Sequence, residues 1–127
     1  MSESEILGAF KKGIISFLDE LIDQFPEEGD LVIMRIFLKD QIPILDVMNR
    51  FIMTVMKFTE EIKDRNESVF LENNILFSDL SKNKVNHFKR LWRSGRLDKD
   101  DKEMVWAWLD SFVLMAQKYQ SVVSSRV

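Results

Sequence analysis

The clearest structural signal lies in DKDDKEMVWAWLDSFVLMAQKYQSV (residues 98–122), where apolar residues return every three or four positions. This period matches the 3.6 residues of a helical turn and predicts one long amphipathic helix. Asp98 is the expected N-cap, and Asp101 follows where the helix dipole favours negative charge. We expect the helix to end near Val122 and residues 123–127 to form a loose tail. Its apolar positions are Met104, Val105, Trp108, Leu109, Phe112, Met115, Ala116 and Tyr119.

Residues 4–25 repeat apolar side chains at the same spacing and predict a first helix. Ser2 or Ser4 is the expected cap, and Pro26 ends the helix. Gly8 and Gly13 each weaken its first half by about 1 kcal/mol relative to Ala, so we expect fraying there unless a neighbour covers that face. The apolar positions are Ile6, Phe10, Ile14, Phe17, Leu18, Leu21, Ile22 and Phe25.

Two helices are predicted on either side of Pro43. Asp30 is the expected N-cap of a second helix that runs to about Gln41. Because Pro is well suited to the first helical position, a third helix is expected from Pro43 to about Lys63. The alternative is one long helix kinked at Pro43, at a cost of about 3 kcal/mol for an interior proline.

The remaining segments give an irregular connection over residues 64–80 and a fourth helix that begins at Ser81. Ser94-Gly95 has the form of a C-terminal stop for that helix. The sequence therefore predicts an all-α fold, a compact bundle of about five helices in a single domain over residues 1–127. The expected breaks lie near residues 26–30, 42–43, 73–81 and 94–98.

Scarce cysteine and histidine exclude most catalytic and metal-binding chemistry. The 127 residues include no Cys, so neither a thiolate metal site nor a cysteine nucleophile can form. The single His, His87, has no partner of fixed geometry in the sequence. We therefore expect no catalytic residue, no bound metal and no organic cofactor, and we predict that the protein is not an enzyme.

Residues 98–102 resemble the start of a calcium-binding loop. The twelve-residue EF-hand loop requires an oxygen ligand at its fifth position, Gly at the sixth and Glu at the twelfth. Lys102, Glu103 and Leu109 occupy those positions. The segment is therefore interpreted as a capped helix start.

Charge is distributed unevenly along the chain, whose net charge is -3. Residues 1–64 carry 7 basic and 13 acidic side chains, whereas residues 65–127 carry 11 and 8. Residues 82–96 include six basic side chains and no acidic one, and such a helix face can bind an acidic partner, phosphates or only solvent. We take Lys89, Arg90 and Arg93 as partner-binding candidates, and the acidic charge of the whole chain disfavours nucleic acid.

Trp106 and Trp108 differ by about 200° around a helix, so both cannot face one small core. Either one is buried and the other exposed, or the helix is covered on two sides. Because an exposed Trp is a frequent interface anchor, we expect Trp106 or Trp108 to anchor a protein partner or a second copy of the chain. Met53, Met56 and Phe58 likewise exceed what one helix face can bury.

The amino-terminal sequence is acidic, and no apolar run approaches 18 residues. A secretory signal would be basic at its start, and a membrane span would need a longer apolar run. We therefore expect an intracellular protein without a membrane span.

Between Arg65 and Tyr119 the sequence resembles those of small helical proteins encoded by large nucleocytoplasmic DNA viruses. The resemblance brings no catalytic motif, and it implies a viral origin and a location in the host cytoplasm, at a viral assembly site or in the virion. The expected function is that of a non-enzymatic structural or assembly protein, a minor capsid or virion component that bridges neighbours through helix faces. The alternative is a helical regulatory binding protein acting on a host or viral partner, with the basic helix 82–96 facing nucleic acid. The segments that carry the resemblance are residues 70–73, 85–89, 91–92, 97–98, 101–103 and 106–110.

Overall fold

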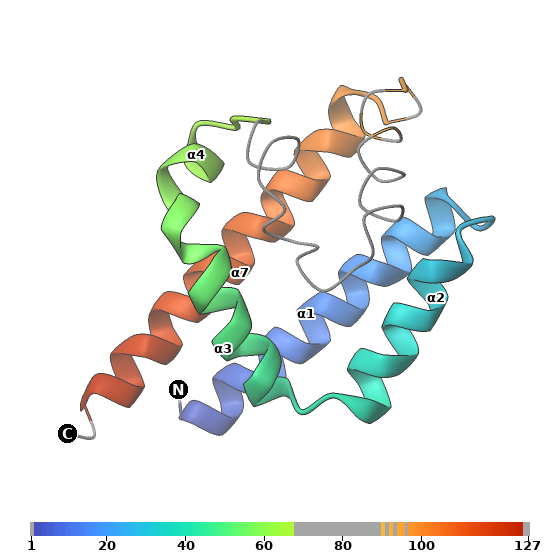
Figure 1. The fold of residues 1–127 in the computed structure, drawn as a ribbon. Helices are drawn as coiled ribbons and strands as arrows, with labels where there is room; N and C mark the ends of the chain where they lie inside the picture. The colour runs from blue at the N-terminus through green and yellow to red at the C-terminus, as the bar shows by residue number, and fades with distance from the viewer. Residues whose placement is uncertain (1, 68–89, 91, 93, 96, 126–127) are drawn as a thin grey trace.

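The computed structural model describes residues 2–67, 90, 92, 94–95 and 97–125, and every regular element within them is helical (Figure 1). The predicted all-α fold class is confirmed. The elements are α1 (Glu3–Gln24), α2 (Gly29–Ile36), the π-helix η1 (Phe37–Gln41), α3 (Ile44–Thr54), the 3-10 helix η2 (Met56–Phe58), α4 (Thr59–Lys63) and α7 (Lys99–Ser125).

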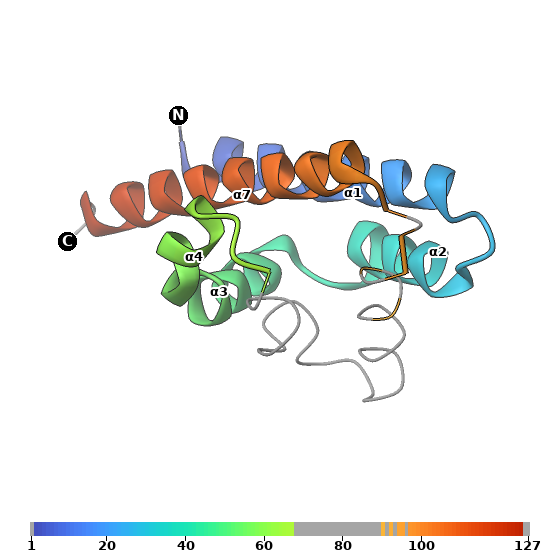
Figure 2. The ribbon, with the colours of Figure 1, turned by 90° about the horizontal axis from the view of Figure 1, so that it is seen from above.

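The helices form two layers (Figure 2). Helices α1 and α7 lie side by side and antiparallel in one layer, and α2, α3 and α4 lie in the other. The Gln24 side chain at the end of α1 donates to Asp101 Oδ1 at the start of α7, at 2.7 Å. Helix α1 also contacts α2, η1 and α3, so it connects the two layers.

Helix α1 begins as the sequence predicts, with Ser2 as its N-cap. The Glu5 amide donates to Ser2 Oγ at 3.2 Å, and the Ser2 amide donates to Glu5 Oε1 at 3.3 Å. A neighbour covers the weak first half of the helix, because Gly13 is buried against Phe112 of α7. A Cβ at Gly13 would lie 3.1 Å from Phe112 Cε1, so the missing side chain allows the two helices to approach closely.

Helix α7 begins at the predicted cap and ends later than predicted. The Asp101 amide donates to Asp98 Oδ1 at 2.8 Å, and the Asp98 amide donates to Asp101 Oδ2 at 3.2 Å. The expected end at Val122 is wrong, because the helix continues to Ser125. Val122 and Val123 pack against the core, and this burial stabilises an additional helical turn. Residues 123–125 are therefore not a loose tail, and residues 126–127 lie outside the described residues.

The start of α2 differs from the prediction that Asp30 is its N-cap. The helix begins at Gly29, after Glu28, and no side chain caps it through a hydrogen bond. Asp30 lies in the first turn, where its carboxylate interacts with the positive end of the helix dipole instead.

The predicted break at Pro43 is confirmed, and the single kinked helix is not what forms. Pro43 is the N-cap of α3, and Ile42 before it is extended, as steric contact with the proline ring requires. The expected continuity to Lys63 is wrong, because α3 ends at Thr54 and a 3-10 turn precedes α4. The Thr54 hydroxyl donates to the Arg50 carbonyl at 2.8 Å, a bond that bends helices.

The core is centred on aromatic rings from α1, α3 and α7. Phe10, Phe51 and Phe112 meet edge to face, with ring centroids 5.6 to 6.4 Å apart. Phe10 is completely buried and Phe112 is 4% exposed. This cluster joins both layers and fixes their separation.

The predicted fourth helix falls mostly outside the described residues. Arg90 and Trp92 are helical, and Gly95 has the left-handed φ of 84° expected of a C-terminal stop. Among the described helices, none is long and apolar enough to cross a membrane.

Candidate interaction surface

Of the predicted basic contacts, Arg90 lies in the described part of the chain, and its side chain is exposed. Lys89 and Arg93 lie outside the described residues. A basic contact surface formed by these three side chains therefore stays a prediction.

Trp106 is enclosed in the core at 3% exposure. Its ring meets that of Trp92 edge to face, with centroids 6.1 Å apart, and the Arg65 guanidinium lies 5.8 Å from its centroid. A side chain enclosed within the chain cannot anchor a partner. The prediction of Trp106 as an anchor is therefore wrong.

Trp108 of α7 is half-buried, on the side of the helix that faces α1. Its ring stacks on Phe112 at 5.7 Å and lies 6.1 Å from Phe17, while its indole N–H donates to Glu20 Oε2 at 2.8 Å. Helix α7 is thus covered on two sides, which was the alternative prediction for this pair of tryptophans. Trp108 contributes to the contact between α1 and α7 and is a poor candidate for an anchor.

The exposed apolar side chains gather instead on α2 and the start of η1. We call Val32, Ile33, Ile36 and Phe37 the α2 apolar face, and their exposed fractions are 41%, 51%, 51% and 49%. Spacings of one, three and one residue place all four on one side of a helix. No residue of α2 or η1 is buried.

Helix α2 and the start of η1 are apolar on both sides: Leu31, Met34 and Leu38 are half-buried on the inner side, and the α2 apolar face lies toward solvent. Arg35 is the basic residue of α2, and its guanidinium forms an ion pair with Asp19 of α1. Because the helix is apolar on both sides, the contact of its inner side with the protein leaves an outer apolar surface for a second contact.

Ile42 after η1 and Leu45 at the start of α3 are also exposed, at 40% and 41%. The Ile42 amide donates to the Phe37 carbonyl at 2.9 Å and closes the π-helical turn. Such turns occur frequently at functional sites.

Other exposed apolar side chains are isolated. Met53 on α3 is 69% exposed, and Leu114 on α7 is 52% exposed. Met56 and Phe58 pack partly against the core, so the expected excess of apolar side chains near Met53 is confirmed for Met53 alone. Single exposed apolar residues are ordinary on protein surfaces, which makes Leu114 a suitable control for the α2 apolar face.

The sequence contains a signal for this surface in residues 31–38, which the tryptophan positions do not indicate. Seven of the eight residues in LVIMRIFL (residues 31–38) are apolar. A helix that is apolar all round must be covered on all sides or present an apolar face. Such a composition between charged neighbours identifies a contact helix, although it does not identify the side that is exposed.

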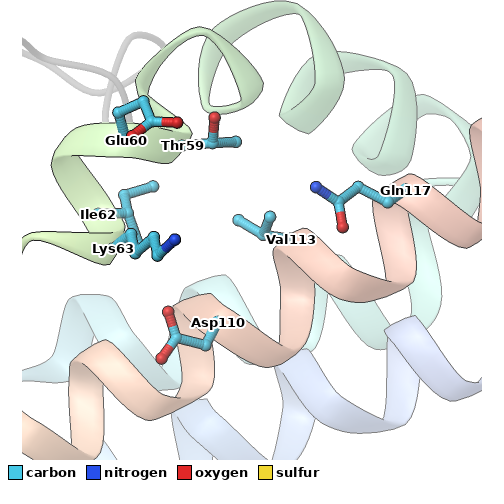
Figure 3. Close-up of a pocket in the computed structure, with 7 residues that line it drawn as sticks. All are labelled: Thr59, Glu60, Ile62, Lys63, Asp110, Val113 and Gln117. Carbon is cyan, nitrogen blue, oxygen red and sulfur yellow. The ribbon is translucent and has the colours of Figure 1, made fainter.

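Two hollows lie on the surface near Arg65, and neither resembles a ligand pocket. One of about 320 Å³ lies between α4 and α7 (Figure 3), and another of about 380 Å³ includes Arg65, Lys102 and Trp106. Ligand pockets are lined mainly by apolar and aromatic groups, whereas charged and amide groups predominate here. The first is lined by Thr59, Glu60, Ile62, Lys63, Asp110, Val113 and Gln117.

Arg65 forms a structural clamp between the end of α4 and α7. Its guanidinium donates to both carboxylate oxygens of Asp110, at 3.0 and 2.8 Å, and lies 3.5 Å from Glu103. The hydrogen bond to Asp110 raises the pKa of Arg65 above its ordinary value. Arg65 has a left-handed φ of 57°, which is strained for a residue with a Cβ, so the ion pairs hold this backbone conformation.

We expect the Arg65→Ala variant to lose about 1 kcal/mol of unfolding free energy, because the ion pairs are partly exposed to solvent. The Arg65→Gly variant should be more stable than Arg65→Ala by roughly 1 kcal/mol, since Gly adopts a positive φ without strain. Urea unfolding of both variants measures the difference. A more stable Arg65→Ala variant would contradict the inferred backbone strain.

Within the described residues, no group of three or more His, Asp or Glu side chains is arranged to hold a metal ion. No protein-family model, curated protein or solved structure matches the chain.

Proposed function

We propose that the protein is a non-enzymatic assembly protein that joins neighbouring protein molecules through a helix face, with the α2 apolar face as its contact surface. The outward apolar side of α2 carries the proposal. Four apolar side chains face solvent while Arg35 faces α1. Covering apolar surface contributes about 25 cal/mol per Å², so a partner that covers this face gains a large part of its binding energy there.

The expected centre of the contact is Phe37, because aromatic side chains often supply most of the binding energy of an interface. Lys39 and Asp40 are exposed beside it, at positions where charged groups commonly form the polar rim of an interface. This location replaces Trp106 and Trp108 as the proposed anchor.

The sequence resemblance supports a more specific role as a minor capsid or virion component that bridges its neighbours. A regulatory partner in the host cell, or nucleic acid at the basic helix 82–96, is the alternative. A structural component is present in stoichiometric copies in purified particles, whereas a regulator is abundant in infected cells and absent from particles. Mass spectrometry of purified particles distinguishes the two roles.

A photo-crosslinking amino acid at position 36 tests the contact surface, and the same substitution at Leu114 is the matched control. The two native side chains are equally exposed, at 51% and 52%, but Leu114 is isolated. We expect crosslinked protein complexes from position 36 at least about tenfold above those from position 114, because only the former lies on an extended apolar patch. Equal crosslinking at both positions would exclude the α2 apolar face.

A further inference from the structure

The segment formed by α2 and η1 differs from α1, α3, α4 and α7 in how little of it is buried. Each of those four helices contributes at least one buried residue, whereas α2 and η1 contribute none. We propose that residues 29–41 form a flap, closed by its inner apolar side and by the Arg35–Asp19 ion pair, that detaches from α1 as one unit while the other described helices stay folded. Detachment is a property of the single chain and is independent of the proposed contact with a partner.

The flap lies at an edge of the fold, and α1 is its main neighbour among the described elements (Figure 1). Its inner side consists of Leu31, Met34, Arg35 and Leu38, at the three- and four-residue spacing of one helix face, and all four are only half-buried. The side chains of Arg35 and Asp19 are 31% and 50% exposed, and an ion pair so open to solvent stabilises little. Elements with few buried contacts open at a lower free energy than the core.

Both ends of the flap are connections that can act as hinges. The turn at residues 26–28 joins α1 to α2, and no side chain caps α2 through a hydrogen bond. At the other end Ile42 is extended and Pro43 is the N-cap of α3. A buried residue lies beyond each hinge, Phe25 at 5% and Met48 at 0% exposure. Detachment can therefore stop at these residues and leave α1 and α3 in place.

A detached flap loses its helical structure. The two elements together span residues 29–41, and isolated helices shorter than about 12–15 residues are marginal in water. The backbone amides of the flap therefore become accessible to solvent whenever it detaches. Leu31, Met34 and Leu38 become accessible at the same moment, so the opening adds the inner apolar side of the segment to the outer one.

Native-state hydrogen exchange of the full chain, followed by mass spectrometry over a urea series below the unfolding transition, tests the flap. After correction for intrinsic rates, we expect amides of residues 33–41 to exchange at least about 100-fold faster than those of residues 105–116 in α7, because a local opening costs less than global unfolding. Exchange of the flap should also depend less on urea, since a local opening exposes less surface. Equal protection of the two segments, or an equal dependence on urea, would overturn the inference.

A variant of the core distinguishes local opening from global unfolding. Phe112→Leu should speed exchange in α7 about tenfold, because a buried ring is lost from the core. The same variant should leave exchange of the flap within about twofold of its original rate, since the core stays folded when the flap opens. Circular dichroism verifies that the variant is folded. Parallel acceleration of both segments would show that they open together and would overturn the inference.

Charge reversal at Asp19 tests the contact that closes the flap. Asp19→Lys places like charges at the ion pair, so we expect exchange of the flap to become at least about threefold faster. The Asp19→Lys/Arg35→Glu double variant restores opposite charges and should return to the original rate. Asp23→Lys is the matched control, because it makes the same change one turn later in α1, where Asp23 has no ion pair with a described residue. An equal effect of Asp23→Lys, or no recovery in the double variant, would contradict the proposed closure through Arg35 and Asp19.

Discussion

Replacing Phe112 by Ala is expected to lower the free energy of unfolding by about 3–5 kcal/mol. Phe112 is 4% exposed and its ring lies within 6.4 Å of four other aromatic rings. Removing it leaves a cavity between α1, α3 and α7 that these rigid rings cannot close. Denaturation in urea, followed by circular dichroism, measures the change. The four neighbouring rings are Phe10, Phe17, Phe51 and Trp108.

Phe37→Ala is the matched control, since it makes the same chemical change on a side chain that is 49% exposed. We expect it to change the stability of the monomer by less than about 1 kcal/mol, because little packing is lost. The difference between the stability losses of Phe112→Ala and Phe37→Ala distinguishes an aromatic residue of the core from one on the contact surface. Similar losses for both variants would contradict the description of α2 as a helix with an outward apolar face.

Gly13→Leu is expected to lower the free energy of unfolding by about 2 kcal/mol. The position of a Cβ at Gly13 is 3.1 Å from Phe112 and 3.7 Å from Trp108, and a leucine side chain extends further into both rings. Overfilling a packed contact forces helices apart or side chains off their rotamers, at about 1–3 kcal/mol. Thermal and urea unfolding both report the loss.

Gly8→Leu is the matched control: it makes the same substitution in the same helix at a position where the added side chain meets no neighbour. No atom lies within 4 Å of a Cβ at Gly8, so this variant should gain roughly 0.5–1 kcal/mol from helix propensity alone. The two substitutions are therefore expected to have opposite signs. A gain in stability from Gly13→Leu would show that α1 and α7 are not closely packed at that point.

The sequence predicts α1 and the start of α7 well because the residues that determine them are close together in the chain. The apolar period of residues 4–25 and the cap at Ser2 are sufficient to place α1. The reciprocal bonds of Asp98 and Asp101 similarly place the start of α7. These interactions form between residues at most four positions apart, so the local sequence is sufficient to predict them.

The sequence fails where distant contacts determine the outcome. The bend after Thr54 allows both Val55 and Ile62 to be buried, and periodicity alone does not reveal which positions meet another helix. Trp106 and Trp108 are both covered because α7 has neighbours on two sides. One of these neighbours is α1, 88 residues away at the Glu20–Trp108 hydrogen bond.

The orientation of α2 could not be predicted for a related reason. With seven apolar residues in positions 31–38, no side of the helix is distinguished by hydrophobicity. The ion pair of Arg35 with Asp19 turns one side toward α1, and that partner lies sixteen residues earlier in the chain. With Arg35 paired to Asp19 and Leu31 packed against the core, Val32, Ile33 and Ile36 are left on the side toward solvent.

The antiparallel pairing of α1 with α7 also constrains how the protein is synthesised. Glu20 leaves the ribosome long before Trp108, and at about 5–20 residues per second the interval between them is roughly 4–18 s. During this time the nascent chain holds Phe10 and the rest of the apolar side of α1 without the helix that covers it. The core therefore cannot close until α7 has emerged, and chaperones that bind apolar segments have seconds in which to engage α1 before α7 displaces them.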